Sequence, residues 1–361
     1  MKKTLLFLAL CSATCTVQAQ IIASENFNAY FPGELNPDIT GQTAANGIYT
    51  LATNGTAPTT ATNAGSDNFE VVENDATHLN VLQVTGTNGN KGGRIFWFES
   101  FQDGWEVRDS GKEIVEVEFD LFTGPGGGTS LNTIDMRING DAGGTIVLSG
   151  FSFDTKTLVL RGIAYYNAPA PGTLASYYFY LGGGQNNVVL PANTWVRLGA
   201  SFNKTTGQVY WRGYNGTTSL FNGQVVGAGA AMDPVQTNFM SLSGTTTTPP
   251  ATNTAESVAL FDNLTITASA TDSLLATDQV NVVENAFSVY PNPATTIINI
   301  ANDHSKITGA TLVDANGRVL KRASFDATTN AQINVSDLPA GVYLMTIESA
   351  EGKVTKKIIK Q

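Results

Sequence analysis

Short runs in which hydrophobic and polar residues alternate fill the chain from Ile21 to about Ala268. The run 114–121 is the clearest of them, because four apolar residues alternate there with three acidic ones. One face consists of Val115, Val117, Phe119 and Leu121, and the other of Glu116, Glu118 and Asp120. A period of two is typical of a β-strand that is buried on one side only. The sequence therefore predicts a half-buried strand over this run.

Further runs of the same kind predict enough strands for two packed sheets. They lie at 145–148, 158–166, 177–181, 195–202, 208–214 and 257–267. No stretch shows a convincing helical period. The Thr-rich and Pro-containing segment 245–254 predicts a loop or an extended connector.

The alternating pattern stops after residue 268 and restarts at Phe287. Small and polar residues between these points predict a linker. The charge balance also changes, because residues 20–284 hold 24 acidic and ten basic residues, whereas residues 285–361 hold six acidic and eight basic ones. We expect a first domain at 20–268, a linker at 269–286 and a second domain at 287–361.

Composition narrows the classes of protein that fit. The 361 residues carry a net charge of −10, which gives no electrostatic basis for binding nucleic acid. Only 14% of the residues are charged and 36 are glycine, which favours strands joined by turns over helices. Two cysteines and two histidines are too few for zinc-finger or Cys–His protease chemistry. The expected fold class is all-β.

The N-terminus has the features of a signal peptide at 1–19. Lys2 and Lys3 precede a short apolar run, and Val17 and Ala19 place small residues where signal peptidase cleaves. Both cysteines, Cys11 and Cys15, lie inside this peptide. No later segment is apolar for the length that a membrane helix needs, so we expect no transmembrane segment. The predicted destination is the extracellular medium or the outer cell surface, reached through the periplasm.

Four motifs occur in order within the last 75 or so residues. They are Tyr290-Pro291-Asn292-Pro293, Asp314 with Gly317, Gly341 with Tyr343, and Lys353 with Lys357. Their order and spacing resemble the type A C-terminal sorting domain of the type IX secretion system. The resemblance implies that the secretion machinery is a partner of this protein. The length of the module is typical of a small immunoglobulin-like β-sandwich.

The first domain resembles a broader group. A strand at 195–202, a turn at 203–207 and a strand from 208 are laid out as in laminin-G-like, concanavalin A-like jelly rolls. The segments around Glu25 and Asp262 resemble the first and last strands of that group, which pair with each other. In jelly-roll binding modules a calcium ion is often held where these strands meet. Glu25 and Asp262 offer the oxygen ligands that calcium prefers, so they are the predicted structural calcium ligands.

Two hypotheses about ligands or substrates remain for the first domain. Its surplus aromatic residues favour a platform that stacks on sugar rings of a glycan. The candidate ligand-binding residues are Trp97, Trp105, Trp211, Tyr178 and Tyr180. The alternative is a glycosidase or polysaccharide lyase that uses Glu116, Glu118 and Asp120. Glycosidases of this fold carry Glu-x-Asp-x-Glu on one strand, whereas this strand carries Glu-x-Glu-x-Asp, so binding is the favoured hypothesis over catalysis.

A third class needs neither a cleft nor catalytic acids. A structural surface or adhesion component would present the same exported, acidic β-domain and would be recognised by self-association. The sequence keeps this alternative open beside the two others.

Overall fold

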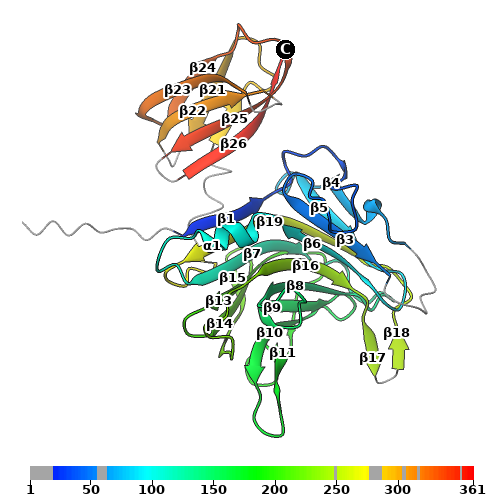
Figure 1. Cartoon of the computed structure of the whole chain (residues 1–361). Helices are drawn as coiled ribbons and strands as arrows, with labels where there is room; N and C mark the ends of the chain where they lie inside the picture. Colours follow the sequence, from blue (N-terminus) through cyan, green and yellow to red (C-terminus); the bar gives the residue numbers. More distant parts are fainter. Residues whose placement is uncertain are drawn as a thin grey trace, which may run out of the picture. The chain divides into compact units, whose positions relative to one another are not determined.

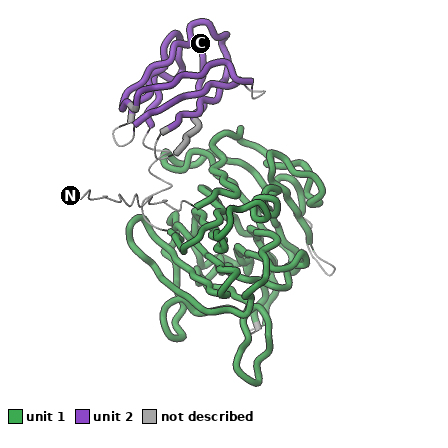
Figure 2. The backbone as a smooth tube through the Cα atoms, turned by 60° about the vertical axis from the view of Figure 1, so that its left-hand side comes forward, with its two compact units in different colours: residues 1–275 green, residues 276–361 purple. Residues whose placement is uncertain are grey.

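The computed structural model describes residues 19–54, 63–247, 250–275, 287–302, 306–314, 318–349 and 352–361. The chain forms two compact units, one ending at Leu275 and the other spanning Ala276–Gln361 (Figure 2). Residues 1–18, which are nearly all of the predicted signal peptide, lie outside the described residues. Within the described part, no helix has the length and apolar character needed to cross a membrane.

Two antiparallel sheets form the first unit (Figure 1). The nine-stranded sheet has the order β15-β14-β13-β7-β19-β5-β4-β2, and β1 pairs with β19. Its strands are β1 (Gln20–Glu25), β2 (Gly33–Glu34), β4 (Phe69–Glu73), β5 (Asn80–Thr85), β7 (Ile114–Phe122), β13 (Trp195–Asn203), β14 (Gln208–Asn215), β15 (Thr218–Val226) and β19 (Val258–Ser269).

The eight-stranded sheet has the order β11-β10-β9-β8-β16-β6-β3, and β12 pairs with β10. Its strands are β3 (Ile48–Thr53), β6 (Gly93–Phe98), β8 (Thr133–Asn139), β9 (Val147–Asp154), β10 (Val159–Asn167), β11 (Leu174–Tyr180), β12 (Val188–Val189) and β16 (Gln236–Leu242). The two sheets pack face to face as the predicted jelly-roll sandwich. The predicted pairing of the first and last strands is also present, with Glu25 opposite Leu264.

Aromatic side chains from both sheets meet at the centre of the sandwich. Phe119 and Phe261 come from the nine-stranded sheet, and Phe96 and Phe239 from the eight-stranded sheet. Their rings contact one another at centroid distances of 5.0 to 6.2 Å, mostly edge to face. All four are buried, and each contributes about 1.5–3 kcal/mol of hydrophobic free energy. The alternation in β7 therefore orients its apolar face into this core, as predicted.

Three local features differ from the sequence-based expectations. The segment expected to be a loop at 245–254 contains a hairpin of β17 (Thr245–Thr247) and β18 (Pro250–Thr252). A helix, α1 (Phe101–Glu106), follows β6 and is too short to leave a recognisable period in the sequence. Residues 269–275, which the sequence assigns to the linker, belong to the first unit and contact its nine-stranded sheet.

The second unit is a sandwich of a three-stranded and a four-stranded sheet. The three-stranded sheet contains β20 (Phe287–Tyr290), β21 (Ile297–Asn302) and β24 (Asn330–Asn334). The four-stranded sheet contains β23 (Val319–Thr328), β22 (Ile307–Val313), β25 (Gly341–Ser349) and β26 (Gly352–Lys360). Its core includes Ile298, Leu312 and Met345, none of which is exposed. The expected all-β class and immunoglobulin-like second module are confirmed.

Candidate functional site

Side chains on the outward side of the eight-stranded sheet combine charge with exposed aromatic rings. We call this surface the front face and define it by Asp135 and Arg137 of β8, Ser152 of β9, Arg161 of β10, and Tyr178 and Tyr180 of β11. Strand register places them close together, because Asp135 lies opposite Ser152, Ser152 opposite Arg161, and Arg161 opposite Tyr180. Directly opposed residues on one face are near neighbours.

Alternation in β11 explains why its two tyrosines point outward. Phe179 lies between them in sequence and packs against the buried ring of Trp211, at a centroid distance of 5.4 Å. Tyr178 and Tyr180 consequently face away from the core and are 55% and 46% exposed. An exposed aromatic ring on a rigid strand is suited to stacking on a sugar ring.

A buried carboxylate lies beside these tyrosines. The side chain of Asp135 is only 1% exposed although it points outward. Its Oδ2 accepts hydrogen bonds from Arg137 Nη2 and Nε at 2.5 and 3.1 Å, and its Oδ1 accepts one from Ser152 Oγ at 2.8 Å. These bonds satisfy the carboxylate within the face and fix the position of Arg137.

The surroundings of Tyr178 favour the protonated form of its hydroxyl. Loss of solvent around the hydroxyl, together with the charge of Asp135, raises the pKa of Tyr178. The protonated hydroxyl is a hydrogen-bond donor at neutral pH.

Trp97 of β6 also lies on the outward side of this sheet, stacked on Tyr49 of β3 at 5.3 Å. Asn238 of β16 pairs with Arg137, and its Oδ1 is buried without a hydrogen-bond partner among the described residues.

Two of the tryptophans proposed as ligand contacts are core residues. Trp105 and Trp211 are 2% and 1% exposed, so neither ring presents a face to a ligand. Trp105 donates from Nε1 to Asp233 Oδ1 at 3.0 Å, and the Arg108 guanidinium lies 3.9 Å from the centre of its ring. The expectation that they contact a ligand is therefore wrong, because both rings are buried in the interior.

The three acids of β7 point away from the core on the opposite side of the sandwich. We call this surface the back face and define it by Glu116, Glu118, Asp120, Arg197, Ser201 and Arg212. Glu116 is 3% exposed. Its Oε1 accepts the backbone N–H of Ser273, and its Oε2 accepts the hydroxyls of Ser269 and Ser273 at 2.7 and 2.8 Å. Burial raises the pKa of Glu116, and the bonds from these serines oppose the rise.

The other two acids are likewise engaged by the chain. Glu118 Oε1 accepts the backbone N–H of Leu275 at 2.7 Å, and its Oε2 accepts Arg197 Nη2 at 3.0 Å. Asp120 Oδ2 accepts Asn263 Nδ2 at 2.7 Å and lies 3.8 Å from His78 Nε2. The row predicted as catalytic therefore offers no pair of carboxylates that is free to act on a substrate.

Residues 269–275 cover this row, and we call them the strap. Asp272 forms an ion pair with Arg212 at 2.8 Å and accepts the Ser201 hydroxyl at 2.6 Å. Leu274 is fully buried. A Cβ on Gly199 of β13 would come within 2.8 Å of Leu274 and 2.9 Å of Leu275, so the strap requires glycine at this position. The acidic row thus anchors the end of the first unit.

The predicted calcium ligands lie near the paired first and last strands, but hydrogen bonds of the chain occupy them. Glu25 Oε1 accepts the backbone N–H groups of Asn26 and Phe27, and its Oε2 accepts the Tyr30 hydroxyl at 3.0 Å. Asp262 is buried and accepts the backbone N–H of Asn263. Among the residues that the structure describes, no group of three or more His, Cys, Asp or Glu is arranged to hold a metal ion. The calcium site stays a prediction.

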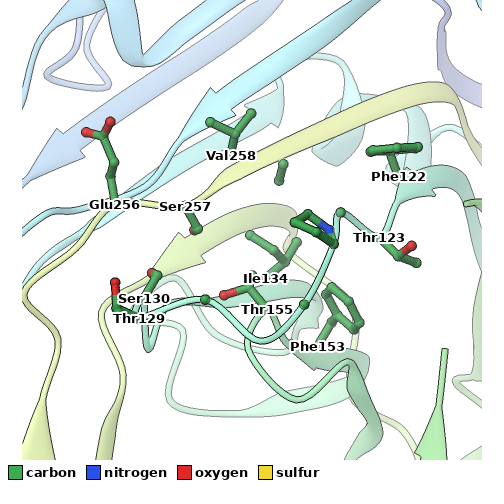
Figure 3. A pocket seen from close by; sticks show the side chains of 15 residues that line it. Phe122, Thr123, Thr129, Ser130, Ile134, Phe153, Thr155, Glu256, Ser257 and Val258 are labelled. Atoms are coloured by element: carbon green, nitrogen blue, oxygen red, sulfur yellow. The ribbon is translucent and has the colours of Figure 1, made fainter. Parts of the chain in front are cut away.

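A pocket of about 340 Å³ lies at one end of the sandwich, between the loop 123–130 and the start of β19 (Figure 3). Phe122, Ile134 and Phe153 line it together with several hydroxyl residues. Two of these hydroxyls are already bonded to the chain, because Thr123 donates to Pro191 O and Thr155 to Asn132 O. These two hydroxyls are therefore engaged within the chain.

In the second unit, the first and last sequence motifs meet. Asn292 donates from Nδ2 to Lys357 O, and its Oδ1 accepts the N–H of Ile359, both at 2.8 Å. Ala294 adds a backbone bond to Ile359 O. The segment that contains Pro291 and Pro293 is therefore fixed along β26, the edge strand that carries the terminal lysines.

The two central motifs stabilise turns. Asp314 accepts the backbone N–H and the Nε–H of Arg318, each at 3.0 Å, at the end of the β22–β23 hairpin. Tyr343 is buried and donates its hydroxyl to Pro339 O at 2.7 Å, which closes the turn around Gly341. Gly317 and the side chain of Lys353 lie outside the described residues.

The second unit is thus a sandwich in which the described motif residues stabilise turns and fix the entry segment on β26. Residues 288–361 match the family model of the secretion system C-terminal sorting domain. The second unit is thus a secretion-system sorting domain, and the type IX resemblance found from its motifs is confirmed. It marks the chain for export to the cell surface or beyond.

No curated protein matches the chain. Among solved structures, it is similar to the PL-14 alginate lyase from Aplysia kurodai, at 12% identity and a TM-score of 0.42, over 69% of this chain and 100% of that one. It is also similar to the catalytic domain of the glycoside hydrolase family 131 protein from Coprinopsis cinerea, at 13% identity and a TM-score of 0.41, over 70% and 98% of the two chains. A third is the CBM2 module of the evolved Dit of Lactobacillus casei BL23 phage J-1, at 9% identity and a TM-score of 0.37, over 70% and 97%. These likenesses assign no activity to this chain.

Proposed function

We propose that the protein is exported by its sorting domain and that the first unit binds a glycan through the front face. The observation that supports binding is the pair of exposed tyrosines, Tyr178 and Tyr180, beside the fixed Asp135–Arg137 pair. Stacking rings supply contact area, and the neighbouring polar groups supply hydrogen bonds to hydroxyls.

The test of binding is a glycan array probed with the full mature chain, followed by titration of each positive glycan. The variant is the double substitution Tyr178→Ala and Tyr180→Ala, for which we expect about a tenfold to hundredfold loss of affinity. Tyr290→Ala is the matched control, because Tyr290 is 50% exposed and lies in the other unit. Retention of no glycan by the unaltered chain would contradict the proposal, and self-association in its place would favour the surface-component alternative.

The test of export is deletion of residues 288–361 in the producing cell. We expect the shortened protein to accumulate in the periplasm, since the sorting domain is its export signal. The double tyrosine variant serves as the control that keeps the domain and should be exported normally. Equal amounts of shortened and complete protein outside the cell would contradict this part of the proposal.

A further inference from the structure

Arg161 occupies the centre of the front face. It lies on β10 between Ser152 on one neighbouring strand and Tyr180 on the other. Its guanidinium carbon is 5.4 Å from the centre of the Tyr180 ring. The arginine and the exposed ring therefore form one surface that a single ligand can touch.

The surroundings of Arg161 are unusual for this acidic unit. Residues 20–284 hold 24 acidic residues and only ten basic ones, so basic side chains have an excess of acidic partners. Six basic residues pair with carboxylates, namely Arg108, Lys112, Arg137, Arg197, Lys204 and Arg212. Arg94 is buried and donates to the carbonyl oxygens of Thr53 and Gly93 and to Asn63. Among the arginines in the described part of the first unit, Arg161 is the one whose side chain forms neither an ion pair with a carboxylate nor a hydrogen bond to another oxygen of the chain.

The two acids nearest to it along the strands are already satisfied. Asp135 is bonded to Arg137 and to Ser152. Asp154, the next outward residue of β9 after Ser152, accepts the backbone N–H groups of Lys156 and Thr157 in the following turn. Asp135 and Arg137 carry opposite charges and bind each other, and Asp154 is held by the turn that follows it, so Arg161 is a cation of the front face without a direct carboxylate partner among the described residues.

We propose that the ligand of the front face is an acidic saccharide, whose carboxylate or sulfate group is bound by Arg161 while its rings stack on Tyr178 and Tyr180. This inference rests on the proposed glycan binding and specifies its ligand class. A guanidinium binds a planar carboxylate or a sulfate through two parallel N–H bonds. The excess of acids elsewhere on the unit does not prevent this contact, because charges further apart than about 8 Å are screened at physiological salt.

The experiment compares polymers that differ mainly in charge. Isothermal titration of the full mature chain uses two pairs of polymers. The first pair is oligomers of polygalacturonate and their uncharged methyl esters, and the second pair is dextran sulfate and uncharged dextran. We expect at least tenfold tighter binding of one charged polymer than of its uncharged counterpart. A preference in the first pair assigns a carboxylate, and a preference in the second pair assigns a sulfate.

The variants separate a specific contact from a general charge effect. Arg161→Gln should lose at least tenfold in affinity for the charged polymer and bind the charged and uncharged forms equally. Arg161→Lys should retain part of the preference. Lys156→Gln is the matched control, because it removes one exposed positive charge from the turn beside β10, and we expect a change of less than twofold.

The outcomes distinguish this inference from the proposed function. Equal binding of charged and uncharged polymers that still depends on Tyr178 and Tyr180 overturns the acidic ligand and leaves glycan binding intact. A loss in Lys156→Gln as large as in Arg161→Gln overturns the specific role of Arg161. If the chain binds other glycans but none of these four polymers, the acidic-saccharide ligand is also overturned. If the chain binds no glycan at all, both proposals are overturned.

Discussion

The two outer faces of the first unit carry similar residues but use them differently. On the back face, Glu116 and Glu118 accept hydrogen bonds from the strap, and Asp120 accepts them from elsewhere in the same chain. On the front face, Tyr178 and Tyr180 are exposed, and Arg161 has no carboxylate partner among the described residues. A row of charged residues on a strand therefore does not by itself indicate a site, because the chain can use all of them as its own hydrogen-bond partners. The comparison predicts that back-face changes alter stability and that front-face changes alter binding.

The largest effect on stability is expected for Glu116→Ala. The substitution leaves the bonding groups of Ser269 and Ser273 without their buried acceptor, so we expect a loss of about 2–3 kcal/mol in the free energy of unfolding. Chemical denaturation of the full chain measures this loss. Glu34→Ala is the control, because Glu34 is exposed, and it should change stability by less than about 0.5 kcal/mol. Equal effects of the two substitutions would contradict an anchoring role for Glu116.

A smaller loss is expected when the strap is displaced by a steric change. Gly199→Leu introduces a side chain where Leu274 and Leu275 now lie, and we expect a cost of about 1–2 kcal/mol. Hydrogen exchange in a peptide that covers 269–275 should accelerate at the same time. Gly128→Leu is the matched control, since no atom of the described residues lies within 4 Å of a Cβ at that position. Unchanged exchange in the strap of Gly199→Leu would show that the strap does not depend on this contact.

Substitutions on the front face should leave the stability of the protein nearly unchanged. Because Tyr178 and Tyr180 are about half exposed, their replacement by alanine should change the free energy of unfolding by less than about 1 kcal/mol for the pair. The same denaturation experiment measures this value beside that of Glu116→Ala. A loss as large as that of Glu116→Ala would mean that the tyrosines are structural, and the contrast between the two faces would fail.

The smallest effect concerns pH. Burial raises the pKa of Glu116 above its ordinary value of 4.5. Because the folded state binds this proton more tightly than the unfolded state, protonation of Glu116 stabilises the fold. This stabilisation is complete below pH 4.5 and is lost as the pH rises through the raised pKa of Glu116 in the folded state. As the pH rises above 4.5, the melting temperature of Glu116→Gln should therefore increase relative to that of the unaltered chain. A constant difference between the two melting curves would contradict this linkage.

Sequence patterns predicted the elements better than they predicted the site. The alternation of β7 identified both its core face and its acidic face, and four motifs identified the sorting domain. The strap could not be predicted, because its small polar residues have no period and its contacts with Glu116 and Gly199 are distant in sequence.

The front face was predicted only in its aromatic part. Tyr178 and Tyr180 were named from residue type, and so were Trp105 and Trp211, which proved to be buried. Arg161 and the Asp135–Arg137 pair were missed. Their signal in the sequence is a charged residue at an outward position between core residues, but only strand register shows that these positions are neighbours.

Hydroxyl-radical footprinting of the full mature chain would show directly whether the front face contacts the glycan. The chain is oxidised with and without a saturating glycan that it binds, and the oxidation rate of each tyrosine is compared. We expect Tyr178 and Tyr180 to be protected when the glycan is bound, whereas Tyr210 and Tyr214 of β14, in the other sheet, keep their rates. Protection of the β14 tyrosines with no change at Tyr178 and Tyr180 would contradict the assignment of the front face.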